Sequence, residues 1–203
     1  MNKYNLPNWK KFSLALKAGN KAKDFGFYSK DGDITRVNAR YRVAKSFHKI
    51  ELEGFSIETT SGYEGLLKVF LTFSTLEGYI NLITNNENPS IPLVAFDFIN
   101  REKANLVSKK VLKLDNKKKF YTFIKRYVTR DNIKNEIDKF YNNEEHNLVF
   151  LLSGIRHIFG HGYLSASSNG ISPKKVNKIC MLLSDFILNE IANDFALRIE
   201  DAS

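Results

Sequence analysis

The sequence predicts an all-α protein, and two kinds of observation support that prediction. Apolar residues recur at helical spacing over several long segments, whereas no segment is rich in strand-forming residues and no glycine-rich phosphate loop follows a strand. Residues that favour helix ends separate these segments, with Ser or Asn where helices are expected to begin and Gly or Pro where they break. The 203 residues are enough for one large domain with a real core.

The N-terminal part predicts two helices. Asn8 is placed to cap a helix over 9–18, and a glycine-rich turn region over 19–33 follows it. The acidic pair in that region resembles a calcium loop only superficially, because the other ligand positions are not filled. A second helix over 34–50 carries a basic outer face, which indicates either a solvated surface or a nucleic-acid contact. We expect residues 1–60 to be a helical extension that packs on a domain over 61–203.

A long helix is expected over 61–84, and it is apolar around so much of its circumference that it should be buried. Glu77 is a lone carboxylate among these apolar residues. A buried carboxylate needs a partner, for which Arg156 is the candidate; otherwise Glu77 reaches solvent.

The next segment is less regular. Two prolines indicate a loop over 85–92, and the pattern over 93–111 indicates a short helix followed by a basic connection. Two more helices are expected over 116–127 and 131–141. The lysines at 117–119 form either an ordinary charged face or a patch that attracts phosphate.

The stretch over 148–163 begins as an apolar helix and ends in a cluster of Arg, His and Gly residues. Its glycines mark the helix end. On a continuous helix Arg156 and His161 would lie about 140° apart, whereas His157 and His161 would share a face. The sequence therefore leaves two pairings open, Arg156 with His161 around a phosphate or His157 with His161 around a metal. No Asp, Glu or Cys lies near enough in sequence to complete a metal site, so none is expected.

The C-terminal part predicts a loop and one long helix. Residues 163–171 are rich in Ser, Ala, Gly and Asn, which is typical of a connector and also suits a loop that gates a substrate. Ser172 and Pro173 mark the start of a final helix that extends to about residue 199, with an apolar stripe along its length.

Arg156, His157 and His161 form an Arg-His-x3-His motif that resembles the R-x4-6-H signature of the HEPN superfamily, a group of all-helical prokaryotic ribonucleases and toxins. A polar residue after the Arg and a Gly after the motif His, here Gly162, also occur in that family. The resemblance covers roughly 62–200. It implies a HEPN-like antiparallel helical bundle, to which the N-terminal helices of this chain are an addition.

The resemblance also implies a function, a metal-independent endoribonuclease of toxin–antitoxin or phage-defence type. His161 would exchange the proton of the ribose 2′-OH, and Arg156 would bind the phosphate oxygens. His157, Glu77 and Tyr163 would support them. Because one His is awkward as both base and acid, a homodimer with two motifs in one cleft is expected. The alternative is a non-catalytic module that binds RNA, a nucleotide or a protein.

The composition of the chain limits its cellular location and the partners that it can bind. The single cysteine excludes a disulfide framework and favours a cytoplasmic location. No signal-peptide-like apolar run and no membrane-spanning apolar stretch is expected. The net charge of +9 favours a polyanionic partner such as RNA, although a lysine-rich genome would give the same excess. No cofactor is expected, and an antitoxin protein is a further candidate partner.

Overall fold

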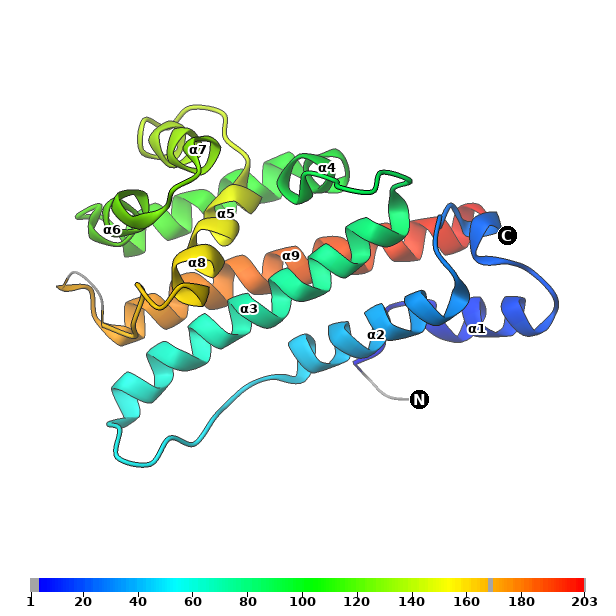
Figure 1. Cartoon of the computed structure of the whole chain (residues 1–203), viewed down its shortest axis with the longest axis horizontal. Coiled ribbons are helices and arrows are strands. Elements are labelled where there is room, and N and C mark those ends of the chain that lie inside the picture. The colour runs from blue at the N-terminus through cyan, green and yellow to red at the C-terminus, as the bar shows by residue number, and fades with distance from the viewer. Residues whose placement is uncertain (1–3, 168–169, 203) are drawn as a thin grey trace.

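The computed structural model describes residues 4–167 and 170–202, and every regular element in those ranges is a helix (Figure 1). The predicted all-α class is therefore confirmed. The elements are α1 (Trp9–Lys17), the 3-10 helix η1 (Ala22–Phe25), α2 (Asp31–Ser46), α3 (Ile57–Ile83), α4 (Ile91–Phe98), α5 (Arg101–Leu114), α6 (Lys119–Tyr127), α7 (Asp131–Tyr141), α8 (Leu148–Gly160) and α9 (Pro173–Asp201).

The two longest helices, α3 and α9, form the centre of the molecule and lie side by side along its long axis (Figure 1). Their backbones approach closely at Gly65, where an added Cβ would lie 2.7 Å from the Cα of Asn177. The two helices run in the same direction, whereas α2 and α8 run antiparallel to α3 (Figure 1). The central pair thus departs from the antiparallel arrangement that the HEPN resemblance implies.

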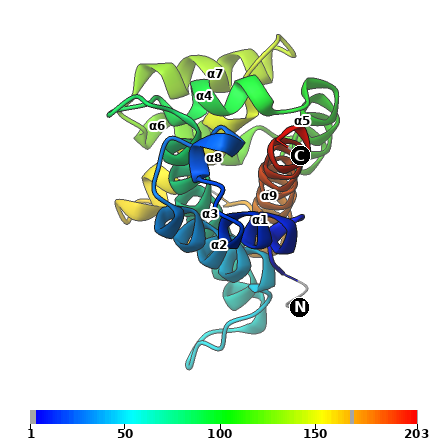
Figure 2. The same ribbon diagram turned by 90° about the vertical axis from the view of Figure 1, so that its right-hand side faces the viewer.

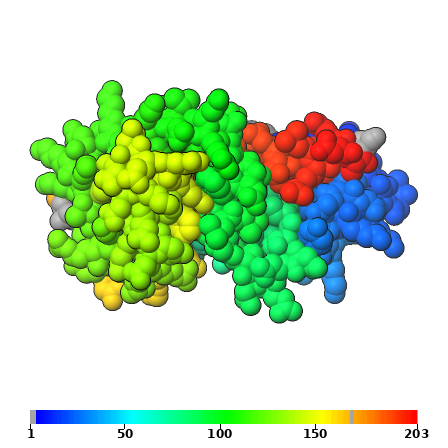
Figure 3. Space-filling model, turned by 90° about the horizontal axis from the view of Figure 1, so that it is seen from above, coloured from blue at the N-terminus to red at the C-terminus, as the bar shows by residue number. Residues whose placement is uncertain are grey.

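The remaining helices cover this pair on two sides. Helices α4–α7 lie above α3 and α9, and α1 and α2 lie below them (Figure 2). Seen from above, the residues from α4 to α8 occupy one end and the middle of the molecule, and the N-terminal helices meet the end of α9 at the other (Figure 3). Phe12 and Phe27 pack on Phe195 of α9. The ring centroid of Phe195 lies 5.8 Å from that of Phe12 and 5.6 Å from that of Phe27. The N-terminal part therefore shares one core with the rest of the chain.

Three local expectations are corrected by the structure. Asn8 precedes α1, but its side chain makes no capping bond and instead donates to Glu200 at 2.9 Å. The expected loop over 85–92 ends earlier, because α4 begins at Ile91 with a proline in its first turn. The expected basic connection is the 14-residue helix α5, whose buried residues Ala104 and Val111 face the core.

Helix α3 also corrects the expectation that no apolar stretch reaches membrane-spanning length. By length and composition alone it could cross a membrane. More than half of its apolar window is buried inside the fold, and the core helix of a globular protein meets the same criterion. This property alone is weak evidence for a membrane.

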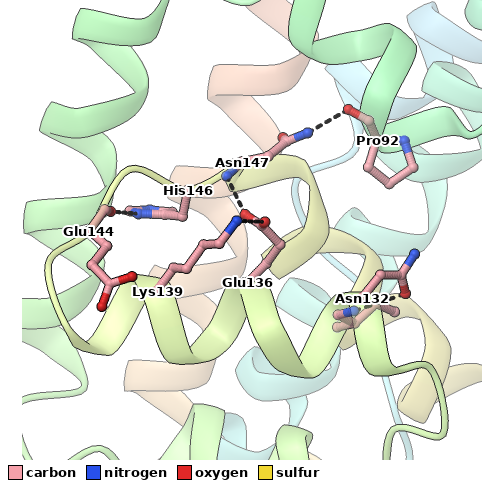
Figure 4. Close-up of polar contacts among 8 residues, drawn as sticks. Pro92, Asn132, Glu136, Lys139, Glu144, His146 and Asn147 are labelled. Carbon is pink, nitrogen blue, oxygen red and sulfur yellow. Dashed lines mark hydrogen bonds and ion pairs between the residues drawn. The ribbon is translucent and has the colours of Figure 1, made fainter.

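One polar residue fixes where α8 begins. Asn147 is 7% exposed, and its side chain accepts a hydrogen bond from the backbone N–H of Val149 at 3.0 Å. Its amide nitrogen donates to the carbonyl of Pro92 in α4 at 2.6 Å, and its backbone N–H donates to Glu136 of α7 at 2.6 Å (Figure 4). Three helices are therefore joined at the start of the helix that carries the motif.

Candidate functional site

The Arg-His-x3-His motif lies at the C-terminal end of α8, and the helix ends there for a local reason. Gly162 has a φ of 77°, a left-handed conformation that favours glycine. The backbone N–H of Gly162 donates to the carbonyl of Phe159 at 3.0 Å, and that of Tyr163 donates to Ile158 at 2.9 Å. These two bonds make a Schellman motif, which places His161 at the C-cap.

His157 and His161 lie against each other, with ring centroids 4.5 Å apart at an interplanar angle of 69°. Their spacing of four residues puts them on one face of the last turn. His157 Nε2 also lies 3.5 Å from the hydroxyl of Thr129, in the connection between α6 and α7. The structure thus brings together the two histidines of the motif within a single chain.

Arg156 lies beside this pair but contacts a different surface. Its guanidinium is 5.3 Å from the ring centroid of Phe73 and 5.9 Å from that of Phe70, both on α3. It makes no ion pair or hydrogen bond with any side chain that the structure describes. Its side chain is partly buried, and its five N–H donors have no acceptor among residues 4–167 and 170–202.

A cavity of about 230 Å³ opens beside Arg156, and four helices line it. Helix α8 contributes Ser153, Arg156 and His157, while α3 contributes Phe73 and Glu77. The first turns of two further helices complete the wall. Their lining residues are Ser90, Ile91 and Pro92 at the start of α4, and Arg130, Asn132 and Ile133 at the start of α7.

Burial and the charges around the cavity change the pKa of His157. Partial burial lowers the pKa of the His157 imidazole, and the nearby His161, Arg130 and Arg156 lower it further. Each of these causes disfavours a positive charge on the ring. His157 is therefore mainly neutral at pH 7, with a ring nitrogen free to accept a proton.

The two other predicted site residues lie at the edge of this region. Glu77 is exposed and lines the same cavity as Arg156, but no ion pair joins them in the part of the chain that the structure describes. The expected buried pair is therefore wrong, and the alternative, that Glu77 reaches solvent, holds. Tyr163 is 56% exposed and stacks on Tyr127, with ring centroids 5.3 Å apart.

The metal alternative gains no support from the geometry. Within residues 4–167 and 170–202, no group of three or more His, Cys, Asp or Glu side chains is arranged to hold a metal ion. The loop suggested as a substrate gate falls partly outside the described residues, at 168 and 169.

Sequence reasoning did not identify Ser153, Arg130 or Asn132 as site residues. They come from two separate segments, Arg130 and Asn132 from the start of α7 and Ser153 from α8, and only the packing of α7 on α8 brings them to one cavity. A buried serine within an apolar helix was the one available signal.

No protein-family model, curated protein or solved structure matches the chain. The resemblance to the HEPN superfamily therefore stays a prediction from the sequence.

Proposed function

We propose that the protein is a metal-independent endoribonuclease of toxin–antitoxin or phage-defence type, with a HEPN-like site. The observation that carries the proposal is the contact between His157 and His161 beside the unpaired guanidinium of Arg156. Two imidazoles and one fixed cation are the groups that RNA cleavage without a metal requires.

Each group has a role in attack by the ribose 2′-OH on the adjacent phosphate. A neutral imidazole takes the proton from the 2′-OH, and a protonated imidazole gives a proton to the leaving 5′-oxygen. Arg156 neutralises the charge that develops on the phosphorane. The lowered pKa of His157 suits it to the base role, which leaves His161 as the acid. The product carries a 2′,3′-cyclic phosphate.

A homodimer remains part of the proposal, because the HEPN resemblance implies two motifs facing one cleft. The contact between His157 and His161 supplies two imidazoles from one chain, so a dimer would add a second set rather than complete the first. RNA is the proposed partner, and an antitoxin protein would hold the enzyme inactive in the cytoplasm.

RNA cleavage in the presence of EDTA tests this proposal. Wild-type protein should yield cyclic phosphate ends. Both Arg156→Ala and His161→Ala should lower the rate by at least about a hundredfold, the usual contribution of a group that stabilises charge in the transition state and of a general acid, respectively. His48→Ala is the matched control, because His48 is exposed on the connection after α2 and should leave the rate unchanged. Equal rates in all four proteins would refute the assignment.

A non-catalytic module that binds RNA, a nucleotide or a partner protein is the second candidate. The placement of Arg156 favours this binding module. Its guanidinium lies against two phenylalanines of α3, whereas His161 contacts His157. Binding of RNA that depends on Arg156, without any cleavage product after long incubation, would support the module over the enzyme.

A further inference from the structure

We propose that the cavity bounded by α3, α4, α7 and α8 binds a phosphomonoester group, which Arg156, Ser153 and the first turns of α4 and α7 hold together. Recognition of the terminal phosphate of an RNA rests on the proposed function. The phosphate site itself does not, because it follows from groups in the cavity that lack a partner.

The first such group is Arg156. A guanidinium recognises a carboxylate or phosphate through two parallel N–H bonds. Here the flat faces of Phe70 and Phe73 support the cation, while its N–H edge has no acceptor among the described residues. An anion that enters the cavity can supply that acceptor.

The second group is Ser153, which independently points to a ligand. Its side chain lines the cavity and is 6% exposed, and its hydroxyl makes no hydrogen bond with any residue in the described ranges. The hydroxyl can therefore bond to a group that enters the cavity. Ser153 precedes Arg156 by three residues and lies next to it on α8, so one bound group can meet both.

The third contribution is backbone charge. The side chain at the N-cap of α4, Ser90, makes no capping bond, and neither does that of Arg130 at the N-cap of α7. Both first turns line the cavity. A helix N-terminus carries a partial positive charge, which favours an anion. Arg130 adds a full positive charge at the same wall.

The shape of the cavity selects between kinds of phosphate. Four of the residues that line it, Phe73, Ile133, Phe150 and Ser153, are buried, so a group that reaches them lies deep in the pocket. A phosphomonoester has one substituent and can reach these residues, whereas a phosphodiester within a chain has two and would meet Arg156 and His157 only at the exposed side of the pocket. Glu77 is exposed and lines the same cavity, where its carboxylate can accept hydrogen bonds from the sugar hydroxyls of the attached nucleotide.

Calorimetric titration with inorganic phosphate tests the site directly. Wild type should bind one phosphate, and Ser153→Ala and Arg130→Gln should each weaken binding by about tenfold, as expected for loss of one hydrogen bond to a charged group. Lys10→Gln removes the same charge from an exposed position on α1, outside the cavity, and should leave the affinity unchanged. Phosphate should also raise the pH at which the His157 ring titrates, which NMR can follow, because a bound anion opposes the cations around it.

The source of the phosphomonoester is resolved by comparing ligands. RNA with a 5′-phosphate, RNA with a 3′-phosphate, a mononucleotide and RNA with hydroxyl ends should each be titrated. Any of the first three that binds more tightly than the last, and loses that advantage in Ser153→Ala, identifies the source. His161→Ala separates the two proposals, since it should abolish cleavage and keep phosphate binding. If wild type shows no saturable phosphate binding, or if Lys10→Gln weakens it as much as Arg130→Gln, the phosphate site is refuted.

Discussion

Asn147 joins α4, α7 and α8, and the destabilisation caused by its removal can be worked from its contacts. Its side-chain oxygen caps α8, and its amide nitrogen donates to the Pro92 carbonyl (Figure 4). Loss of an N-cap Asn costs about 1 kcal/mol, and loss of the bond to the carbonyl adds about 1 kcal/mol. We therefore expect Asn147→Ala to lower the free energy of unfolding by about 2 kcal/mol. For a chain of this length, that change lowers Tm by about 4–8 °C.

A second variant separates the two contributions. Asn147→Ser keeps a capping oxygen but is too short to reach Pro92, so it should lose only about 1 kcal/mol. Asn142→Ala is the control, because the Asn142 side chain bonds only to Glu144 at an exposed position. Its free energy of unfolding should change by less than about 0.5 kcal/mol.

Urea denaturation followed by helical circular dichroism measures all three variants. The reasoning fails if Asn147→Ala is as stable as wild type, or if Asn147→Ser is as unstable as Asn147→Ala. Because Asn147 positions the start of α8, Asn147→Ala should also reduce RNA cleavage at temperatures where the protein remains folded.

Further predictions concern packing, pH and charge. Gly65→Ala should cost about 1–3 kcal/mol in urea denaturation, since its Cβ would meet backbone of α9, whereas Gly32→Ala has open space and should not destabilise. The pKa of His157 is lowered in the folded state, so below about pH 6.5 the unfolded chain takes up the proton first. Stability should therefore fall as the pH drops below that value, and His157→Gln should reduce this slope. Arg156→Met should leave the free energy of unfolding unchanged or raise it, because the variant removes a partly buried charge without a partner and places sulfur on two aromatic rings, while RNA binding should be lost.

Sequence pattern was sufficient for the helices that bury a wide apolar face. The predicted helix over 131–141 agrees with α7 at both ends, and α8 follows from its run of apolar residues. Helix α5 was missed because its buried residues, Ala104, Ser108 and Val111, include two that are small or polar and stand among lysines. Periodicity is a weak signal where the buried stripe is narrow.

The site was predicted only as far as local spacing reaches. A separation of four residues on a helix brings His157 and His161 together, and the structure has that contact. The cavity depends on where α3, α4 and α7 lie relative to α8, which is a property of packing between distant segments. Glu77 illustrates the limit, because its apolar neighbours in the sequence do not reveal that its own side chain reaches solvent.

The unpaired state of Arg156 is what separates this site from an ordinary helix end. For stability alone, a partly buried guanidinium would be paired with a carboxylate or replaced by an apolar residue. Here two phenylalanines of α3 support the charge by cation–π contact, and its hydrogen-bonding edge has no acceptor among the described residues. Departures of this kind from local consistency are expected where a residue serves function. Arg156 therefore links both proposals, since the cation that would stabilise the phosphorane also lines the cavity proposed to bind phosphate.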